Sequence, residues 1–120
     1  MRQQTVLVVE DNEVLRRAFR AALTVGGFAV DEAADGIDAL RRIDCSPPDL
    51  VVLDLGLPNV SGHGVLYDLT TQPHTREIPV VVVTGSPEAF EDIDVTRILR
   101  KPFTTATLVK TVQECLAPAG

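Results

Sequence analysis

Short apolar runs, rich in β-branched residues, recur along the chain and are expected to form β-strands. The three clearest are residues 5–9 (TVLVV), 50–53 (LVVL) and 79–84 (PVVVVT). Uninterrupted apolar runs of this length are typical of parallel strands that helices cover on both faces. Residues 28–30 and 97–99 are weaker candidates because polar residues flank them. The pattern therefore predicts five strands.

Between the first two of these strands, residues 13–25 show the apolar spacing of an amphipathic helix. The expected buried stripe consists of Val14, Leu15, Ala18, Phe19, Ala22 and Leu23, and Arg16, Arg17 and Arg20 are expected on the other side. Gly26 and Gly27 are expected to end the helix, because glycine accepts the left-handed conformation of a helix cap.

Further helices are expected at residues 37–43, after Ser61-Gly62 and after Pro102, where Thr104 is a candidate N-cap. Their apolar stripes include Val65, Leu66 and Leu69 in the third helix and Leu108, Val109, Val112, Cys115 and Leu116 in the last. Ser86-Pro87 resembles a further helix start, but the next strand follows so soon that this fourth helix must be short or partly unwound.

Strands and helices thus alternate along the chain, which predicts a doubly wound α/β fold with a parallel sheet. The length of 120 residues suits a single domain spanning residues 1–120. Its core is expected over residues 5–117, and residues 118–120 are either a natural tail or the edge of a longer protein.

Composition narrows the classes of partner. The net charge is −6 and no basic run offsets it, so direct binding to nucleic acid is not expected. The apolar runs are far shorter than the ~20 residues that a membrane-spanning helix needs. No secretory signal pattern is apparent, and the two cysteines, Cys45 and Cys115, lack the spacing of a metal site. A cytoplasmic protein is expected, since two cysteines make no disulfide scaffold.

Polar residues follow the strands at the points where each strand ends. Glu10 and Asp11 follow the first strand, and Asp54 follows the third. Thr84 and Gly85 end the fourth strand, and Lys101 follows the fifth. Ligands of open α/β sheets bind at this carboxyl edge. Three clustered carboxylates would repel unless a cation joined them, and Mg²⁺ or Mn²⁺ is the natural guest.

The remaining groups at this edge suit a phosphoryl group. The Lys101 ammonium can pair with a phosphoryl oxygen, while the Thr84 hydroxyl and the Gly85 amide can donate hydrogen bonds to it. A carboxylate such as that of Asp54 can act as the nucleophile and form an acyl phosphate.

Four motifs in order resemble the receiver domains of the bacterial two-component response regulators. They are VLVVEDNE (6–13), PDLVVLDLGLPNVSG (48–62), VVVVTG (80–85) and RKPF (100–103). The resemblance covers residues 5–117. It implies a flavodoxin-like five-stranded parallel sheet in the order 2-1-3-4-5, here with a shortened fourth helix.

The resemblance also implies a role for each matching residue of the acidic edge. Asp54 corresponds to the phosphoacceptor, which takes a phosphoryl group from a phosphohistidine of a sensor histidine kinase or a histidine phosphotransfer protein. Asp11 corresponds to a direct metal ligand, as does Asp54, and Glu10 acts on the metal through water. The backbone carbonyl of Gly56 corresponds to the third protein ligand of the metal.

The resemblance implies phosphoryl-contacting and switching roles for the later strands. Lys101 corresponds to the lysine that pairs with the phosphoryl group, and Lys101-Pro102 is a candidate cis peptide. Thr84 corresponds to the hydroxyl residue that moves toward the phosphate and switches the domain. Gly56 and Ser86 correspond to positions that tune hydrolysis of the acyl phosphate; both are small, and a short phosphorylated lifetime is expected.

Two departures from the family pattern concern the output of the switch. Ile98 occupies a position that is usually aromatic, so coupling from phosphate to the output face either weakens or works through aliphatic packing. The segment between Thr84 and Lys101 is shorter than usual.

These departures leave a non-switching receiver-like interaction module as the alternative to a phosphoryl-accepting switch. Neither is an enzyme with an outside substrate. An aspartyl-phosphate phosphatase of the haloacid-dehalogenase type is disfavoured because position 56 is glycine instead of aspartate. His63 and His74 are expected as surface residues, while Phe19, Phe28 and Phe103 are expected in the core.

Overall fold

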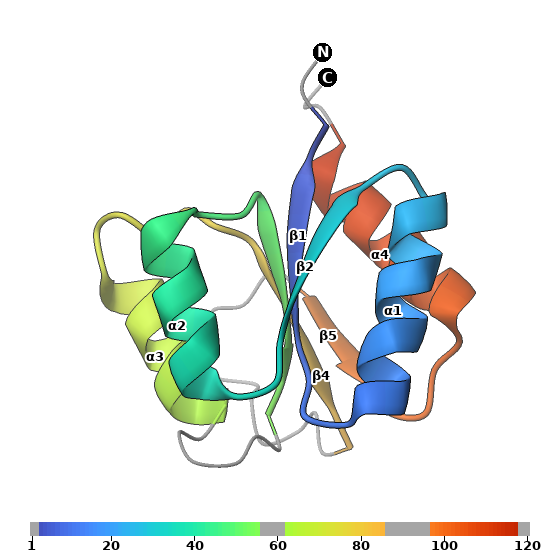
Figure 1. Ribbon diagram of the computed structural model, residues 1–120, viewed down its shortest axis with the longest axis horizontal. Helices are drawn as coiled ribbons and strands as arrows, with labels where there is room; N and C mark the ends of the chain where they lie inside the picture. Colours follow the sequence, from blue (N-terminus) through green and yellow to red (C-terminus); the bar gives the residue numbers. More distant parts are fainter. Residues whose placement is uncertain (1–2, 56–61, 86–96, 118–120) are drawn as a thin grey trace.

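The computed structural model describes residues 3–55, 62–85 and 97–117 and shows a parallel β-sheet between two helical layers (Figure 1). The five strands have the order β2-β1-β3-β4-β5. They are β1 (Thr5–Val9), β2 (Ala29–Ala33), β3 (Leu50–Asp54), β4 (Val80–Thr84) and β5 (Arg97–Arg100). The doubly wound α/β fold and the strand order predicted from the sequence are both confirmed.

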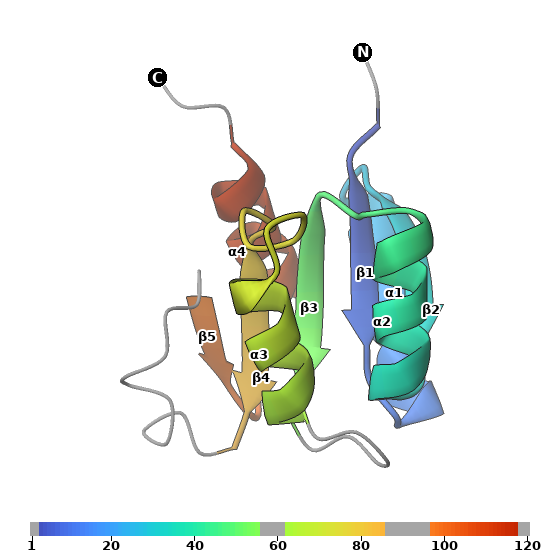
Figure 2. The same ribbon diagram turned by 90° about the vertical axis from the view of Figure 1, so that its left-hand side faces the viewer.

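Helices lie on both faces of the sheet, and the described residues form four of them (Figure 2). They are α1 (Glu13–Val25), α2 (Gly36–Cys45), α3 (Gly62–Thr71) and α4 (Thr105–Leu116). Helices α2 and α3 cover one face, and α1 and α4 cover the other. The short helix expected after Thr84 falls in residues 86–96, which lie outside the described residues.

The central strands β3 and β4 are buried at every position, as their uninterrupted apolar runs predicted. The prediction for β2 was wrong at both ends, because the strand covers Ala29–Ala33 instead of residues 28–30. This strand pairs only with β1, at the edge of the sheet. An edge strand tolerates polar residues such as Asp31 and Glu32, so the apolar run of β2 is shorter than the strand.

Helix α1 begins and ends where the sequence predicted. The Asn12 side chain accepts a hydrogen bond from the Leu15 N–H at 3.0 Å and caps the first turn. At the other end, Gly27 has φ 102°, a conformation that side chains rarely adopt.

The predicted buried stripe of α1 was only partly correct. Phe19 and Leu23 are buried, but Val14 is 79% exposed and Leu15 is 38% exposed. The first turn of α1 lies level with the carboxyl ends of the strands, at one end of the sheet (Figure 1). Arg16 was expected in solvent and is instead only 15% exposed.

The predicted cap of α4 is confirmed, and α2 extends beyond both ends of the predicted residues 37–43. Asp35 caps α2, and Thr104 caps α4 by accepting from the Thr107 N–H at 3.1 Å. The stripe residues of α3 and α4 that are buried are Val65, Leu66, Leu69, Leu108 and Val112.

The core consists of two clusters, one on each face of the sheet. The cluster under α2 and α3 includes Leu53, Val65 and Leu69 and is aliphatic among the described residues. The cluster under α1 and α4 contains Phe28 and also Phe19, whose ring stacks on Phe103 at a centroid distance of 5.6 Å. None of the described helices is long and apolar enough to cross a membrane.

Candidate phosphoacceptor site

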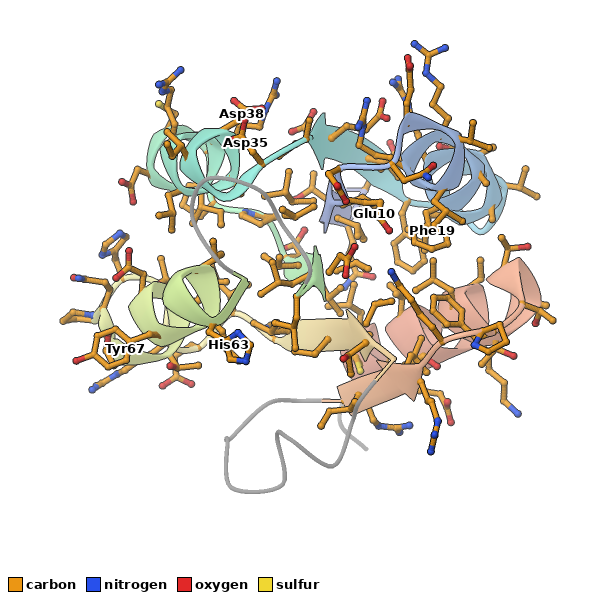
Figure 3. The ribbon with its side chains drawn as sticks, turned by 90° about the horizontal axis from the view of Figure 1, so that it is seen from below. Glu10, Phe19, Asp35, Asp38, His63 and Tyr67 are labelled. Atoms are coloured by element: carbon orange, nitrogen blue, oxygen red, sulfur yellow. The ribbon has the colours of Figure 1, made fainter. Side chains whose placement is uncertain are left out.

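The predicted site residues gather at the carboxyl edge of the sheet. Glu10 follows β1, Asp54 ends β3, Thr84 ends β4 and Lys101 follows β5. Because the strands are parallel, these ends all lie at one edge. Seen from that edge, Glu10 lies between the helical layers and Tyr67 lies on the outer side of α3 (Figure 3).

Three carboxylates meet at this edge. Glu10, Asp11 and Asp54 each offer an oxygen within 4.8 Å of the others. Glu10 is 1% exposed and Asp54 is 6% exposed, whereas Asp11 is open to solvent. Two charges 4 Å apart repel by about 4 kcal/mol at an effective dielectric constant of 20. The cluster therefore needs a proton or a cation to remain assembled.

Lys101 supplies one positive charge. Its Nζ lies 3.3 Å from Asp54 Oδ2, to which it donates a hydrogen bond, and 3.7 Å from Glu10 Oε1. The Lys101-Pro102 peptide is cis, as the sequence suggested. A single ammonium cannot neutralise three carboxylates, so the cluster keeps an excess of negative charge.

This excess of negative charge contributes to a raised pKa of the Glu10 carboxyl. Burial, with the neighbouring carboxylates of Asp54 and Asp11, raises the pKa of Glu10 from 4.5 to about 8 against the opposing effect of Lys101. Among residues 3–55, 62–85 and 97–117, Glu10 Oε1 is the buried side-chain atom that lacks a hydrogen-bond partner. A buried oxygen without a hydrogen bond beside two further carboxylates fits a hard divalent cation such as Mg²⁺, which binds carboxylates and retains waters.

The ends of β4 and β5 are joined beside this cluster. The Lys101 N–H donates to the Thr84 carbonyl at 2.8 Å, just beyond the pairing of Thr84 with Arg100. Thr84 is buried and Gly85 is exposed. Ile98 is half-buried and packs against the core cluster under α2 and α3.

Some of the residues singled out in the sequence lie elsewhere. Gly56 and Ser86 lie outside the described residues. His63 and His74 are exposed, as expected, and His74 Nε2 lies 3.1 Å from Asp44 Oδ1.

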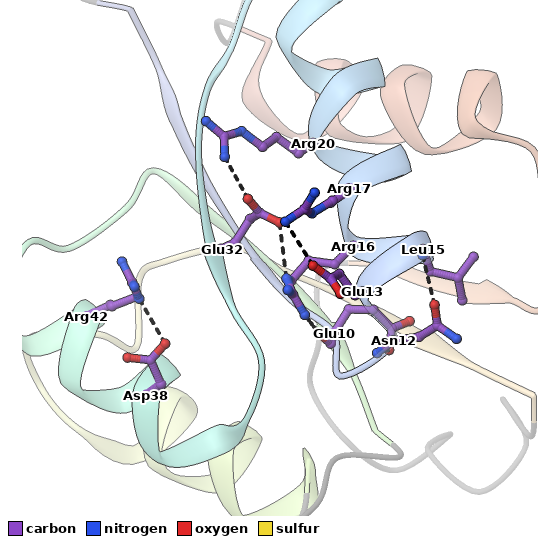
Figure 4. A network of polar contacts seen from close by, with 10 residues as sticks. All are labelled: Glu10, Asn12, Glu13, Leu15, Arg16, Arg17, Arg20, Glu32, Asp38 and Arg42. Atoms are coloured by element: carbon purple, nitrogen blue, oxygen red, sulfur yellow. Dashed lines mark hydrogen bonds and ion pairs between the residues drawn. The ribbon is translucent and has the colours of Figure 1, made fainter.

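Sequence reasoning missed one contact of the site. Arg16 Nη1 donates to the Glu10 carbonyl at 3.0 Å, and Arg16 Nε donates to Glu32 Oε1 at 3.1 Å (Figure 4). The helical pattern assigned Arg16 to solvent, and the predicted second strand ended before Glu32. The sequence signal that was available is the pairing of opposite charges between the first turn of α1 and the end of β2.

Comparison with known proteins identifies relatives of the whole domain. The family model described as response regulator receiver domain matches residues 6–113. The polar-differentiation response regulator DivK of Brucella anthropi is 30% identical, with 97% of this chain and 98% of that protein covered.

Solved structures agree in fold. The chemotaxis response regulator CheY4 of Vibrio cholerae superimposes with a TM-score of 0.88 at 29% identity, covering 96% of this chain and 100% of that one. The receiver domain of sensor histidine kinase PA1611 from Pseudomonas aeruginosa gives a TM-score of 0.84 at 30% identity, covering 94% of this chain and 97% of that one. That structure has a magnesium ion coordinated in its active site cleft.

Proposed function

The chain belongs to the response regulator receiver family of two-component signalling, and on that premise we propose that Asp54 accepts the phosphoryl group. The observation that carries the proposal is the position of this buried carboxylate. It ends β3, lies within 4.8 Å of the Glu10 and Asp11 carboxylates and accepts a hydrogen bond from Lys101. Phosphoryl transfer depends on such positioning and charge stabilisation.

The acidic residues would have different roles in binding Mg²⁺. Asp11 and Asp54 would hold Mg²⁺ directly, Glu10 would act through water, and the Gly56 carbonyl would be the third protein ligand. The ion supplies positive charge that offsets the phosphoryl oxygens. The transition from three repelling carboxylates to a bound cation would also release the proton that the raised pKa keeps on Glu10.

An Asp54 carboxylate oxygen then attacks the phosphorus of a phosphohistidine. The new oxygen–phosphorus bond forms as the nitrogen–phosphorus bond breaks, and the imidazole leaves. Lys101 would pair with a phosphoryl oxygen, and the Thr84 hydroxyl and the Gly85 amide would donate hydrogen bonds to the others.

Thr84 and Ile98 would carry the signal away from the site. The packing of Ile98 against the cluster under α2 and α3 supports transmission through aliphatic contacts. Gly56 and Ser86 would set the rate at which water removes the phosphoryl group.

The donor of the phosphoryl group would be a sensor histidine kinase or a histidine phosphotransfer protein. Residues 1–120 would act as one cytoplasmic domain, alone or within a longer protein, that catalyses only its own phosphorylation and dephosphorylation. The acidic cluster counts against a module that never switches, since the mutual repulsion of three close carboxylates destabilises the fold unless a cation binds there.

Intact-mass spectrometry after incubation with acetyl phosphate tests the proposal. We expect one phosphoryl adduct that requires Mg²⁺ and is absent from Asp54→Asn. An adduct that persists in Asp54→Asn would assign the phosphoacceptor elsewhere. If no adduct forms, binding of beryllium fluoride in the presence of Mg²⁺ distinguishes rapid hydrolysis from an inert domain.

A further inference from the structure

Arg16 lies in the first turn of α1, yet its side chain turns toward the sheet (Figure 4). It is only 15% exposed, whereas its neighbour Arg17 is 71% exposed. Its guanidinium donates two hydrogen bonds, which leave the helix in different directions. One hydrogen bond goes to the backbone carbonyl of Glu10, and the other goes to the Glu32 carboxylate on β2.

Glu32 is a fixed and charged anchor for this arginine. Its other carboxylate oxygen accepts a hydrogen bond from Arg20 Nη1 at 2.7 Å. Burial acts to raise the pKa of Glu32, but the two arginines outweigh it and the pKa lies below its usual value. Glu32 therefore remains ionised at neutral pH and holds the Arg16 guanidinium in place.

Arg16 extends the link between β1 and β2 past Val9, the last paired residue of β1. The strand register ends with Val9 opposite Ala33. One step further, the Glu10 N–H donates to the Ala33 carbonyl at 3.1 Å. The Glu10 carbonyl has Arg16 as its donor, and Arg16 is itself anchored on β2. Both peptide groups of Glu10 are thereby tied to the same edge strand.

This arrangement bears on the carboxylate cluster because the Glu10 carbonyl belongs to the peptide that joins Glu10 to Asp11. A shift of the backbone at that peptide would redirect both side chains relative to Asp54. Repulsion within the cluster favours such a shift when no cation is present. A planar guanidinium that donates to two acceptors at once restrains it in a way that a point charge does not.

We propose that Arg16, anchored by Glu32, is a positioning residue that holds the Glu10–Asp11 peptide in the orientation required to bind a divalent cation with Asp54. The inference rests on the proposed function, because it assumes that the cluster binds Mg²⁺. Partners that orient metal ligands typically change metal affinity by about 10- to 100-fold when they are removed.

The direction in which Mg²⁺ affinity changes when Arg16 is replaced distinguishes a positioning role from a purely electrostatic one. An arginine near a cation site repels the cation, so removal of the charge alone would strengthen Mg²⁺ binding. Loss of a positioning contact weakens it. Arg17→Met is the matched control, because it removes the same charge from the same helix and disrupts an exposed pair with Glu13.

The test is a Mg²⁺ titration of wild type, Arg16→Met, Arg16→Lys and Arg17→Met, followed by backbone amide chemical shifts. We expect Arg16→Met to weaken Mg²⁺ affinity by about tenfold or more and Arg17→Met to stay within about twofold of wild type. Arg16→Lys keeps the charge but lacks the fork that reaches both acceptors, and an intermediate loss is expected. Urea unfolding without Mg²⁺ establishes which variants are folded.

Each result bears on one proposal. If wild type does not bind Mg²⁺, the proposed function fails. If wild type binds and Arg16→Met binds equally or more tightly, only the positioning role is overturned. If Arg16→Met does not fold, Arg16→Lys decides, because affinity equal to that of wild type would exclude a role for the two-acceptor geometry.

Discussion

Aspartates stand at both ends of β3, and their surroundings differ. Asp49 precedes the strand, and its Oδ2 accepts hydrogen bonds from the Thr5 N–H at 2.7 Å and the Thr5 hydroxyl at 3.2 Å. Its own N–H donates to the Thr5 carbonyl at 2.9 Å. Asp54 ends the strand beside two other carboxylates and one lysine.

The two edges of the sheet therefore use the same chemistry for different purposes. At the amino edge, the carboxylate of Asp49 is matched to donors and ties β3 to β1. At the carboxyl edge, like charges are held together and Glu10 Oε1 lacks a hydrogen bond. Polar groups that only stabilise a fold are satisfied within it, while groups that bind a ligand are left to be satisfied by that ligand.

The largest expected effect concerns the pH dependence of Glu10 without Mg²⁺. The pKa of the Glu10 carboxyl is about 8 in the folded state and near 4.5 in the unfolded state. Between these pH values the folded state therefore binds more protons than the unfolded state. Stability contributed by this proton is complete below pH 4.5 and is lost as the pH rises to about 8.

Glu10→Gln keeps the shape of the protonated side chain and removes the titration. Its unfolding free energy should rise relative to wild type by at most about 1.4 kcal/mol per pH unit within that window. Urea denaturation at several pH values in chelator measures the difference. A constant difference from pH 5 to pH 8 would contradict the description of the carboxyl edge as electrostatically strained.

The second largest expected change in unfolding free energy comes from the packing density at the two edges of the sheet. A Cβ at Gly26, near the amino edge, would lie 2.8 Å from Val109 Cγ1. Valine is branched at Cβ and cannot move aside freely, so Gly26→Ala should lower the unfolding free energy by about 2 kcal/mol.

Gly85 at the carboxyl edge is the control for this substitution. A Cβ there would meet nothing within 4 Å. Gly85→Ala should therefore change the unfolding free energy by less than about 0.5 kcal/mol. Equal losses of unfolding free energy in Gly26→Ala and Gly85→Ala would contradict the inferred difference in packing between the two edges.

A smaller effect is expected from the satisfied aspartate. Asp49→Ala removes the acceptor of the Thr5 N–H and Thr5 hydroxyl, and should lower the unfolding free energy by about 1.5 kcal/mol. The contrast with Glu10→Gln is largest at pH 8 without Mg²⁺. There Asp49→Ala should lower the unfolding free energy, and Glu10→Gln should raise it. Loss of stability in both would mean that the two edges are equally satisfied.

Apart from the Gly85→Ala control, the smallest expected effect is the stabilisation of wild type by Mg²⁺. A ligand that binds only the folded state at ten times its Kd stabilises it by about 1.4 kcal/mol. Thermal unfolding should show this shift in wild type and in Asp49→Ala, but a reduced shift in Asp54→Asn. An equal shift in Asp54→Asn would indicate that Mg²⁺ binds away from the acidic cluster.

The sequence predicted the strands and helices best where a pattern was uninterrupted. The limits of α1 followed from a continuous apolar period between Asn12 and Gly26, and β4 followed from a run of valines. The extent of β2 was missed because this edge strand is only partly covered and includes the polar residues Asp31 and Glu32. The exposure of Val14 was missed because periodicity identifies a face of a helix but not where the core beneath it stops.

The same reasoning explains what was predictable in the site. Glu10, Asp54, Thr84 and Lys101 were found because parallel strands bring their ends together whatever the intervening sequence. The 3.3 Å contact of Lys101 with Asp54 and the raised pKa of Glu10 depend on burial, which only the structure gives. The contact of Arg16 with the Glu10 carbonyl involves the backbone and leaves no mark in a pattern of side chains.

The assembly of the site from separate strand ends has a consequence for how the protein is made. Glu10, Asp54 and Lys101 meet only when β1, β3 and β5 occupy one sheet, so their contacts span most of the chain. Such long-range contacts form late in folding, after the cost of closing large loops has been met. During synthesis, a chain that has not yet reached Lys101 holds no complete site, and competence to receive a signal arrives together with the finished fold.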